Sequence, residues 1–410
     1  MEASRILQTL IHKGLGAGAH QDWNLLRGDL SFPCAVLYQY RLQQNLQWMQ
    51  QFIAAYKLNL APHGKTTMAP RLFSMQLNAG AWGITLATAH QTSIAYAHGV
   101  RRILMANQLV GKENMATISR LLADPEFEFY CLVDSPTLIS QLADFFSAHN
   151  QRLHVLVELG VPGGRAGVRD QAQLDTLLVA LTQHRNTIAL SGVELYEGVL
   201  EDETSIREFL RRAVSVTRAL LDEERFARTP ALLSGAGSAW YDVVAEEFAA
   251  ADFGGAVEIV LRPGCYLTHD VGAYRQAQQR IEAHNPVAHA MQSKLKAALQ
   301  IWACVQSIPE DGRAIIGMGK RDAAFDAGLP VPALHYRAGQ KQPTATPAHW
   351  TLTKMMDQHA YMQIAAGDDI RVGDILAFDI SHPCLTFDKW RVLSVVNSNY
   401  GVVDQIETYF

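Results

Sequence analysis

The sequence predicts an α/β protein in which a (β/α)₈ barrel is followed by a smaller antiparallel β domain. From about residue 33 to residue 263, short apolar segments alternate with amphipathic helical segments, which is typical of parallel strands covered by helices. After about residue 270 the pattern changes to strand-like segments with few helices, which is typical of an antiparallel sheet. We therefore predict an N-terminal segment over residues 1–30 that packs on the second domain. The barrel is expected over residues 31–275, and the β domain over residues 276–410.

The predicted barrel strands follow one another at regular spacing. The first covers residues 33–38, and the others cover residues 57–61, 83–88, 102–107, 128–134, 154–159, 190–196, 231–235 and 258–263. Helical patterns separate nearly all of them, at residues 90–98, 114–122, 136–149, 171–184 and 205–222. Eight or nine such units suit a closed barrel. An open doubly wound sheet is less favoured, because no Gly-x-Gly-x-x-Gly motif follows the first strand.

The second domain begins with a helical segment. This helix is expected over residues 274–284, and strands are expected at residues 294–308, 314–318, 370–378 and 390–396. A polar loop that contains proline, residues 339–349, interrupts the predicted strands.

Composition limits the classes of function. The net charge of −5 gives no electrostatic basis for binding nucleic acid or an anionic membrane, and no apolar run reaches the roughly 18 residues of a membrane span. The first residues carry an acid where a signal peptide would carry bases. Five scattered cysteines fit reduced thiols better than a disulfide framework. We expect a cytoplasmic protein without a nucleic-acid or membrane partner.

Lys65 is the first candidate for chemistry. It follows an apolar segment, residues 56–60, and lies in a turn formed by Pro62 and Gly64. This places it at the carboxyl end of a strand, where α/β proteins carry their active sites. A lysine held between apolar neighbours can lose its proton and form a Schiff base with an aldehyde cofactor. A solvated loop lysine is the alternative that this stretch alone leaves open.

Other candidates follow the later strands. Arg165, in a glycine-rich stretch, could hold a carboxylate or a ring nitrogen, and Tyr196 could lie against a flat ring. Taken singly, a surface arginine and a core tyrosine are equally compatible with these positions. Arg262 and Tyr266 follow the last strand and supply a further arginine and tyrosine.

A glycine-rich corner at residues 234–238 suggests a phosphate site. Its small residues would let backbone amides approach an anion closely, and the corner lacks the lysine of a nucleotide-binding loop. A cofactor phosphate is therefore favoured over a nucleoside triphosphate. The candidate residues are Ser234, Gly235, Gly237 and Ser238.

The second domain contains a candidate metal pair. His382 and Cys384 are two residues apart and would point the same way in extended chain, and their nitrogen and sulfur atoms suit Zn²⁺. Two protein ligands would leave positions for water and substrate. A surface histidine and a buried cysteine are the alternative interpretation. His359 could add a further polar, catalytic group.

Taken together and in order, these motifs resemble the D-serine dehydratase and D-threonine aldolase family, pyridoxal-phosphate enzymes related to alanine racemase. The resemblance covers most of the chain, through residues 62–66, 83–88, 164–167, 196–198, 234–238, 262–266 and 382–384. It implies that Lys65 is the Schiff-base lysine of pyridoxal 5′-phosphate. The glycine-rich corner would lie near the phosphate, with His382 and Cys384 as the zinc ligands.

The sequence also departs from the family pattern. Thr67 replaces the last histidine of Pro-His-x-Lys-Thr-His, and Ala236 replaces a second glycine. The usual Glu-His-Gly is here Asp357-Gln358-His359-Ala360. These departures indicate a divergent subgroup, so the substrate need not be D-serine.

The resemblance favours dehydration of a D-3-hydroxy amino acid to a 2-oxo acid and ammonia. Family members with His-x-Cys resemble dehydratases, whereas the aldolases tend to have His-x-Asp. The first alternative is a D-threonine-type aldolase that releases glycine and an aldehyde. A racemase and a non-catalytic pyridoxal-phosphate carrier are further alternatives, although carriers lack a second domain. The resemblance also implies a homodimer.

Overall fold

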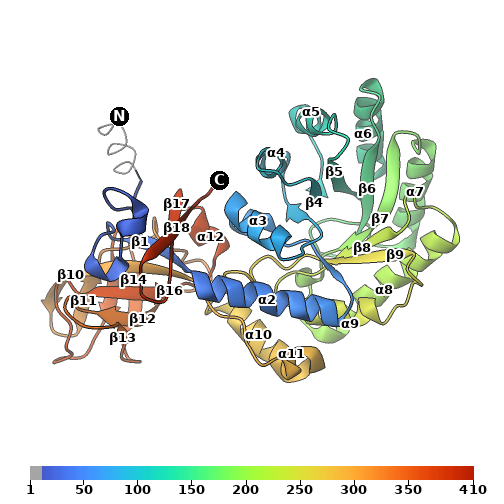
Figure 1. Cartoon of the computed structure of the whole chain (residues 1–410). Helices are drawn as coiled ribbons and strands as arrows, with labels where there is room; N and C mark the ends of the chain where they lie inside the picture. The colour runs from blue at the N-terminus through green and yellow to red at the C-terminus, as the bar shows by residue number, and fades with distance from the viewer. Residues whose placement is uncertain (1–11) are drawn as a thin grey trace.

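Eight parallel strands form a closed barrel in the computed structural model, which describes residues 12–410 (Figure 1). The strands are β2 (Asn59–Leu60), β3 (Ile84–Leu86), β4 (Arg102–Gln108), β5 (Glu128–Val133), β6 (Leu153–Leu159), β7 (Ile188–Leu195), β8 (Ala231–Gly235) and β9 (Val257–Leu261). Their spatial order is β2-β9-β8-β7-β6-β5-β4-β3. The circle closes between β2 and β3, where the amide of Trp82 donates to the carbonyl of Leu60 at 2.7 Å and His63 bridges to Thr85.

Helices cover the outside of the barrel. They are α2 (Gln39–Ala55), α3 (Pro70–Asn78), α4 (Ala89–Ala97), α5 (Lys112–Leu121), α6 (Pro136–Ala148), α7 (Gln171–Gln183), α8 (Glu203–Asp222) and α9 (Tyr241–Ala249). Local sequence explains where several of them begin. The side chains of Thr88, Ser135, Asp170 and Asp202 each accept a hydrogen bond from the amide three residues later, which satisfies a free donor of the first turn.

The second domain is a ten-stranded, mostly antiparallel sheet. It contains β1 (Cys34–Tyr38), β10 (Leu299–Glu310), β11 (Arg313–Ile316), β12 (Val331–Tyr336), β13 (Thr344–Ala345), β14 (Thr351–Met355), β15 (Ala360–Gln363), β16 (Ile375–Asp379), β17 (Val392–Val396) and β18 (Val402–Glu407). Helices α10 (Ala273–His284) and α11 (Pro286–Ala290) precede this sheet, and the short α12 (Cys384–Phe387) lies between β16 and β17. The predicted fold class, a barrel followed by an antiparallel β domain, is confirmed.

One strand belongs to the other sheet. Residues 33–38 were expected to open the barrel, but β1 pairs with β10 and β17 of the second domain. All five residues of β1 are buried, so its apolar pattern does not differ from that of a barrel strand. Its neighbours in the sheet are distant in sequence, and a local pattern cannot reveal them. Helix α2 then carries the chain from this sheet across to the barrel (Figure 1).

Within residues 12–30, the chain contacts the second domain. Short 3₁₀ helices, η1 (His20–Asp22) and η2 (Leu25–Arg27), flank Trp23 and Asn24. Asn24 bridges to Gly401, and the amide of Val402 donates to the carbonyl of Trp23 at 2.9 Å. Residues 1–11 of the predicted N-terminal segment lie outside the described residues. Within residues 12–410, no helix has both the length and the apolar character needed to cross a membrane.

Candidate functional site

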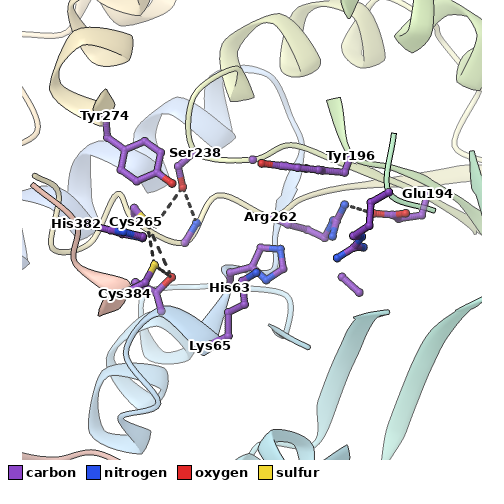
Figure 2. Close-up of a pocket in the computed structure, with 15 residues that line it drawn as sticks. His63, Lys65, Glu194, Tyr196, Ser238, Arg262, Cys265, Tyr274, His382 and Cys384 are labelled. Carbon is purple, nitrogen blue, oxygen red and sulfur yellow. Dashed lines mark hydrogen bonds and ion pairs between the residues drawn. The ribbon is translucent and has the colours of Figure 1, made fainter. Parts of the chain in front are cut away.

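A cavity of about 390 Å³ lies where the carboxyl ends of the barrel strands meet the second domain (Figure 2). Its volume is within the range of small-molecule sites, roughly 300–1,000 Å³. Most of the lining comes from the ends of the barrel strands and the segments that follow them. The remainder comes from α10 and from residues 382–384 at the start of α12. The lining residues are His63, Lys65, Thr66, Ala106, Arg165, Glu194, Tyr196, Gly237, Ser238, Arg262, Gly264, Cys265, Tyr274, His382 and Cys384.

Lys65 enters this cavity from η3 (Gly64–Thr66), the single 3₁₀ turn that follows β2. The turn packs tightly beneath the lysine. A Cβ atom at Gly64 would lie 2.8 Å from side-chain carbons of both Ile84 and Phe73, so only glycine fits there. Lys65 itself is exposed to the cavity while Gly64 and Thr66 are buried. The packed turn therefore fixes the position from which the amine projects.

Arg262 and Glu194 form a buried ion pair in the wall of the cavity. The guanidinium also donates to the carbonyl of Leu195 at 2.9 Å, while its Nε atom is buried without a partner. Burial raises the pKa of Glu194, and the charge of the adjacent Arg262 opposes this shift. Arg262 was expected at the end of a strand, but no role was predicted for it. Its position directly after β9, at the carboxyl end of a barrel strand, could have indicated a place in the site.

His63 contributes a second unpaired polar atom. Its Nδ1 is buried without a hydrogen-bond partner. Burial lowers the pKa of His63 well below its usual value, and the positive charges of Arg262 and Lys65 lower it further. The imidazole is therefore neutral at neutral pH. His63 Nδ1 and Arg262 Nε are thus two buried polar atoms at the cavity wall without a hydrogen-bond partner. A bound ligand could supply that partner.

The glycine-rich corner differs from the expected phosphate site. The carboxylate of Glu197, in η4 (Glu197–Val199), accepts hydrogen bonds from the amides of Gly237 at 2.6 Å and Ala236 at 3.1 Å. Ser234 and Gly235 do not line the cavity, because they are buried within β8, where the Ser234 hydroxyl donates to the carbonyl of Val260. The amides of Ala236 and Gly237 therefore donate to Glu197 and are not free to bind a phosphate.

Ser238, the last residue of the glycine-rich corner, does line the cavity. The hydroxyl of Ser238 accepts hydrogen bonds from the amides of Gly264 at 3.2 Å and Cys265 at 3.1 Å (Figure 2). All three residues line the cavity. Tyr274, from α10, points toward Ser238 (Figure 2). It was not among the residues predicted for the site.

Two further sequence candidates lie away from the cavity. Tyr266 is buried, and its hydroxyl accepts a hydrogen bond from Gln76 at 3.1 Å, which directs it toward α3. His359 lies in the turn between β14 and β15, where its carbonyl accepts from the amide of Met356 and its ring packs on Tyr361. Neither residue lines the cavity.

Arg165 and Tyr196 do reach the cavity. The Arg165 guanidinium lies 3.6 Å from the buried carboxylate of Glu158, and more than half of its side chain remains exposed. The ring of Tyr196 packs against Gly237, where a Cβ atom would lie 2.8 Å from a ring carbon. Tyr196 therefore presents a flat, partly exposed ring to the cavity (Figure 2).

His382 and Cys384 face the cavity from the second domain. The chain is not extended there, because Pro383 has helical angles and Cys384 begins α12, but both side chains still line the cavity. His382 Nδ1 lies 2.7 Å from Asp326 Oδ2. Cys384 Sγ lies 3.5 Å from the hydroxyl of Thr66 and 3.9 Å from Cys265 Sγ.

Contacts within the cavity shift the pKa values of His382 and Cys384 in opposite directions. Hydrogen bonding with Cys265, together with the imidazole of His382, lowers the pKa of the Cys384 thiol to about 4. Hydrogen bonding to Cys384 and then to Asp326 raises the pKa of His382 to about 9. Within residues 12–410, no group of three His, Cys, Asp or Glu side chains is arranged to hold a metal ion. A metal here would have two protein ligands and open positions.

Comparison with known families identifies both halves of the chain. Residues 39–267 match the family model for the alanine racemase N-terminal domain, and residues 298–396 match the model described as "Putative serine dehydratase domain". A D-threonine aldolase of Arthrobacter sp. is 26% identical over 91% of this chain and 90% of its own length. A D-threo-3-hydroxyaspartate dehydratase of Delftia sp. (strain HT23) is 28% identical over 41% of this chain and 44% of its own.

Solved structures show the same fold. The crystal structure of D-threonine aldolase from Filomicrobium marinum has a TM-score of 0.75 and 22% identity, and the match covers 93% of this chain and 95% of that one. The Delftia D-threo-3-hydroxyaspartate dehydratase has a TM-score of 0.70 and 21% identity, covering 94% and 99% of the two chains. A cysteine-to-alanine variant of that dehydratase was solved in a metal-free form.

Proposed function

This chain belongs to the alanine racemase N-terminal-domain family, with a serine dehydratase-type domain after the barrel, and we propose that it is a lyase of D-3-hydroxy amino acids. One observation carries the proposal. The amine-bearing Lys65 of the barrel and the His382–Cys384 pair of the second domain line the same cavity. A lysine suits an aldehyde cofactor, and an imidazole with a thiolate suits zinc. The relatives named as D-threonine aldolase and D-threo-3-hydroxyaspartate dehydratase support this class of reaction.

The residues of the cavity fit pyridoxal 5′-phosphate. Lys65 would hold its aldehyde carbon. The Ser238 hydroxyl, which accepts from the amides of Gly264 and Cys265, keeps its own hydrogen to donate to the phosphate. The unpaired Nε of Arg262 can donate to an acceptor on the ring, and Tyr196 offers a face for it. When bound, this cofactor supplies an electron sink for charge that develops at the substrate Cα.

The chain's own groups then move protons and position the substrate. The Nζ of Lys65 would take the Cα proton of the substrate. His382 and Cys384 would hold zinc, which when bound acts as a Lewis acid on the substrate's 3-hydroxyl group. Arg165, largely exposed at the cavity and loosely paired with Glu158, is available for a substrate carboxylate.

We favour dehydration, which gives a 2-oxo acid and ammonia, because the metal pair is His-x-Cys. Aldol cleavage is the second candidate, because the D-threonine aldolase of Arthrobacter sp. matches nine-tenths of the chain. The two reactions differ in the fate of the 3-hydroxyl group, which leaves in dehydration and is deprotonated in aldol cleavage.

The cofactor assignment is tested by absorbance. Protein reconstituted with pyridoxal 5′-phosphate should show a band near ~420 nm that borohydride removes, because the lysine is covalently linked to the cofactor. Lys65→Ala should lack this band, whereas Lys112→Ala, which alters an exposed lysine at the start of α5, should retain it. A borohydride-sensitive band in Lys65→Ala would contradict the assignment.

The reaction is tested with a panel of D-3-hydroxy amino acids, measuring 2-oxo acid and aldehyde separately. We expect 2-oxo acid in the presence of zinc and at least a ~100-fold slower reaction after chelation or in Cys384→Ala. Release of glycine and aldehyde would establish the aldolase instead. Full activity in the presence of chelator would show that the reaction does not need zinc.

We also propose that the protein is a homodimer. His359 lies outside the cavity of its own chain, so it can act in catalysis only if a second copy brings it to a cavity. Sedimentation should give about twice the chain mass of 45.3 kDa. A fully active monomer would contradict this proposal.

A further inference from the structure

Two cysteine side chains from different domains meet at the wall of the cavity. Cys265 follows β9 of the barrel, and Cys384 begins α12 of the second domain, 119 residues later in the chain. Their sulfur atoms are 3.9 Å apart, and the hydroxyl of Thr66 lies 3.9 Å from one and 3.5 Å from the other (Figure 2). The three residues connect the second domain to the turn that carries Lys65.

Cys384 is partly exposed at the cavity, and Cys265 lies buried directly beside it. Both cysteines line the cavity, whereas Cys34 and Cys131 are fully buried in strands β1 and β5. The proposed function uses Cys384 alone, as a metal ligand, and gives the thiol of Cys265 no task. Free cysteines usually pack in the core as small apolar groups. These two instead line a polar cavity, with their sulfur atoms in contact.

We propose that Cys265 and Cys384 form a reversible disulfide, a modification site that joins the barrel to the second domain and occupies the sulfur of Cys384. The bond length is about 2.05 Å, so the sulfurs must approach by about 1.9 Å from their present 3.9 Å. Two side chains that already touch can cover much of this distance by rotation about χ1. Disulfides of this kind in reducing compartments are typically transient and redox-sensing.

The chemistry balances with a peroxide as oxidant. One thiolate attacks hydrogen peroxide to give a sulfenic acid and hydroxide, and the second thiol displaces water from that sulfur to form the S–S bond. Two thiols thus lose two hydrogens, and one peroxide becomes two water molecules. An external dithiol reverses the reaction by thiol–disulfide exchange.

The disulfide has two consequences. It fixes α12 against the segment after β9, so the two walls of the cavity can no longer separate. A sulfur held in a disulfide also cannot act as a thiolate ligand, so zinc held by His382 and Cys384 would lose one ligand. This second consequence rests on the proposed function, whereas formation of the bond does not.

The bond is tested in purified full-length protein treated with hydrogen peroxide. The number of free thiols, measured after unfolding, should fall from five to three and return to five after dithiothreitol. Mass spectrometry of the unreduced digest should contain the linked Cys265 and Cys384 peptides. Five remaining thiols, or a link that uses other cysteines, would overturn the proposal.

Variants add a matched control. Cys304→Ala alters a half-buried cysteine outside the cavity and should leave the linked peptide unchanged, with a fall from four thiols to two. In Cys265→Ser, the number of free thiols should stay at four after peroxide treatment, because Cys384 has no partner. Because the wild-type digest identifies the bond directly, the proposal stays testable if this variant does not fold.

Metal release separates this proposal from the proposed function. Zinc-loaded protein should release its zinc to a chromophoric chelator at least ~10-fold faster after oxidation, and Cys265→Ser should show no such increase. If the disulfide forms in protein that never binds zinc, the zinc assignment fails and the thiol site stands. If the disulfide forms and zinc is retained, the loss of the metal ligand is contradicted.

Discussion

His63 and His382, both at the cavity, have opposite charge states because their surroundings differ. His63 is buried beside Arg262 and Lys65, which lowers its pKa well below the usual value and keeps it neutral. His382 contacts the Cys384 sulfur and Asp326, which raises its pKa to about 9. A metal that binds His382 must therefore displace a proton, so we expect metal uptake to release protons at neutral pH.

His269 gives a prediction for stability. Burial lowers the pKa of His269 to about 4, and Arg275 adds to the shift. The unfolded chain, with a pKa near ~6.5, then binds more protons than the folded chain between these values, so stability falls as the pH falls from about 6.5 to about 4. Between pH 7 and pH 5 this residue should cost about 2 kcal/mol of unfolding free energy.

Denaturant unfolding of wild type and His269→Asn at pH 7 and pH 5 checks this prediction. Asparagine suits the positive φ of 49° at this position. The variant should lose about 2 kcal/mol less than wild type between the two pH values. Burial raises the pKa of neighbouring Asp270 to about 6, which acts in the opposite direction, but this contribution is present in both proteins. Equal losses would show that His269 does not carry the acid sensitivity.

At the scale of elements, two loops share one close contact. The segment after β9 passes over η3 at Gly264, where a Cβ atom would lie 2.6 Å from the Cβ of His63 and 2.8 Å from its carbonyl oxygen. The backbones can approach only because this residue has no side chain. The contact holds Gly264 and Cys265, whose amides donate to the Ser238 hydroxyl, next to the turn that carries Lys65. It therefore joins the proposed phosphate donor Ser238 to the proposed Schiff-base lysine.

Gly264→Ala should force these two loops apart. We expect a loss of about 1–3 kcal/mol in unfolding free energy and at least a ~10-fold weaker affinity for pyridoxal 5′-phosphate. Gly317→Ala is the matched control, because its nearest neighbour to an added Cβ is 3.6 Å away. Thermal unfolding and cofactor titration measure the two effects. Gly264→Ala with the stability and affinity of the control would show that the contact is unimportant.

At the scale of the whole molecule, α2 joins the two domains through Asn45. Its buried side-chain amide donates to the carbonyls of Leu267 at 2.8 Å and Lys296 at 2.7 Å, and its oxygen accepts from the amide of Lys296 at 2.8 Å. One side chain thus links the barrel helix to the end of the barrel and to the segment that enters the second sheet. The relative position of the domains, and hence of the cavity walls, depends on this residue.

Asn45→Leu should remove these three hydrogen bonds at similar side-chain volume. Because buried backbone groups lose their partners, we expect a loss of about 3 kcal/mol in unfolding free energy. The control is Gln44→Ala, which removes an exposed hydrogen bond to the same segment, at the carbonyl of Lys294, and should cost less than about 1 kcal/mol. Equal losses of unfolding free energy in the two variants would contradict the view that Asn45 holds the two domains together.

Much of the fold could be predicted because local sequence encodes it. Buried apolar strands and capped amphipathic helices alternate along the chain, and the eight strands from β2 to β9 lie within a few residues of their predicted positions. The placement of β1 could not be predicted, since its partners β10 and β17 are encoded hundreds of residues away.

The sequence by itself determined the barrel, the antiparallel second domain and the turn that presents Lys65, because each depends on local pattern and on residues adjacent in the chain. Only the tertiary structure decided which side chains share the cavity. In the folded chain the Gly237 amide donates to Glu197, Arg262 forms an ion pair with Glu194, and the sulfur of Cys265 lies next to that of Cys384. The physical reason is that hydrogen bonds and contacts between distant segments depend on packing geometry, which no local sequence pattern contains.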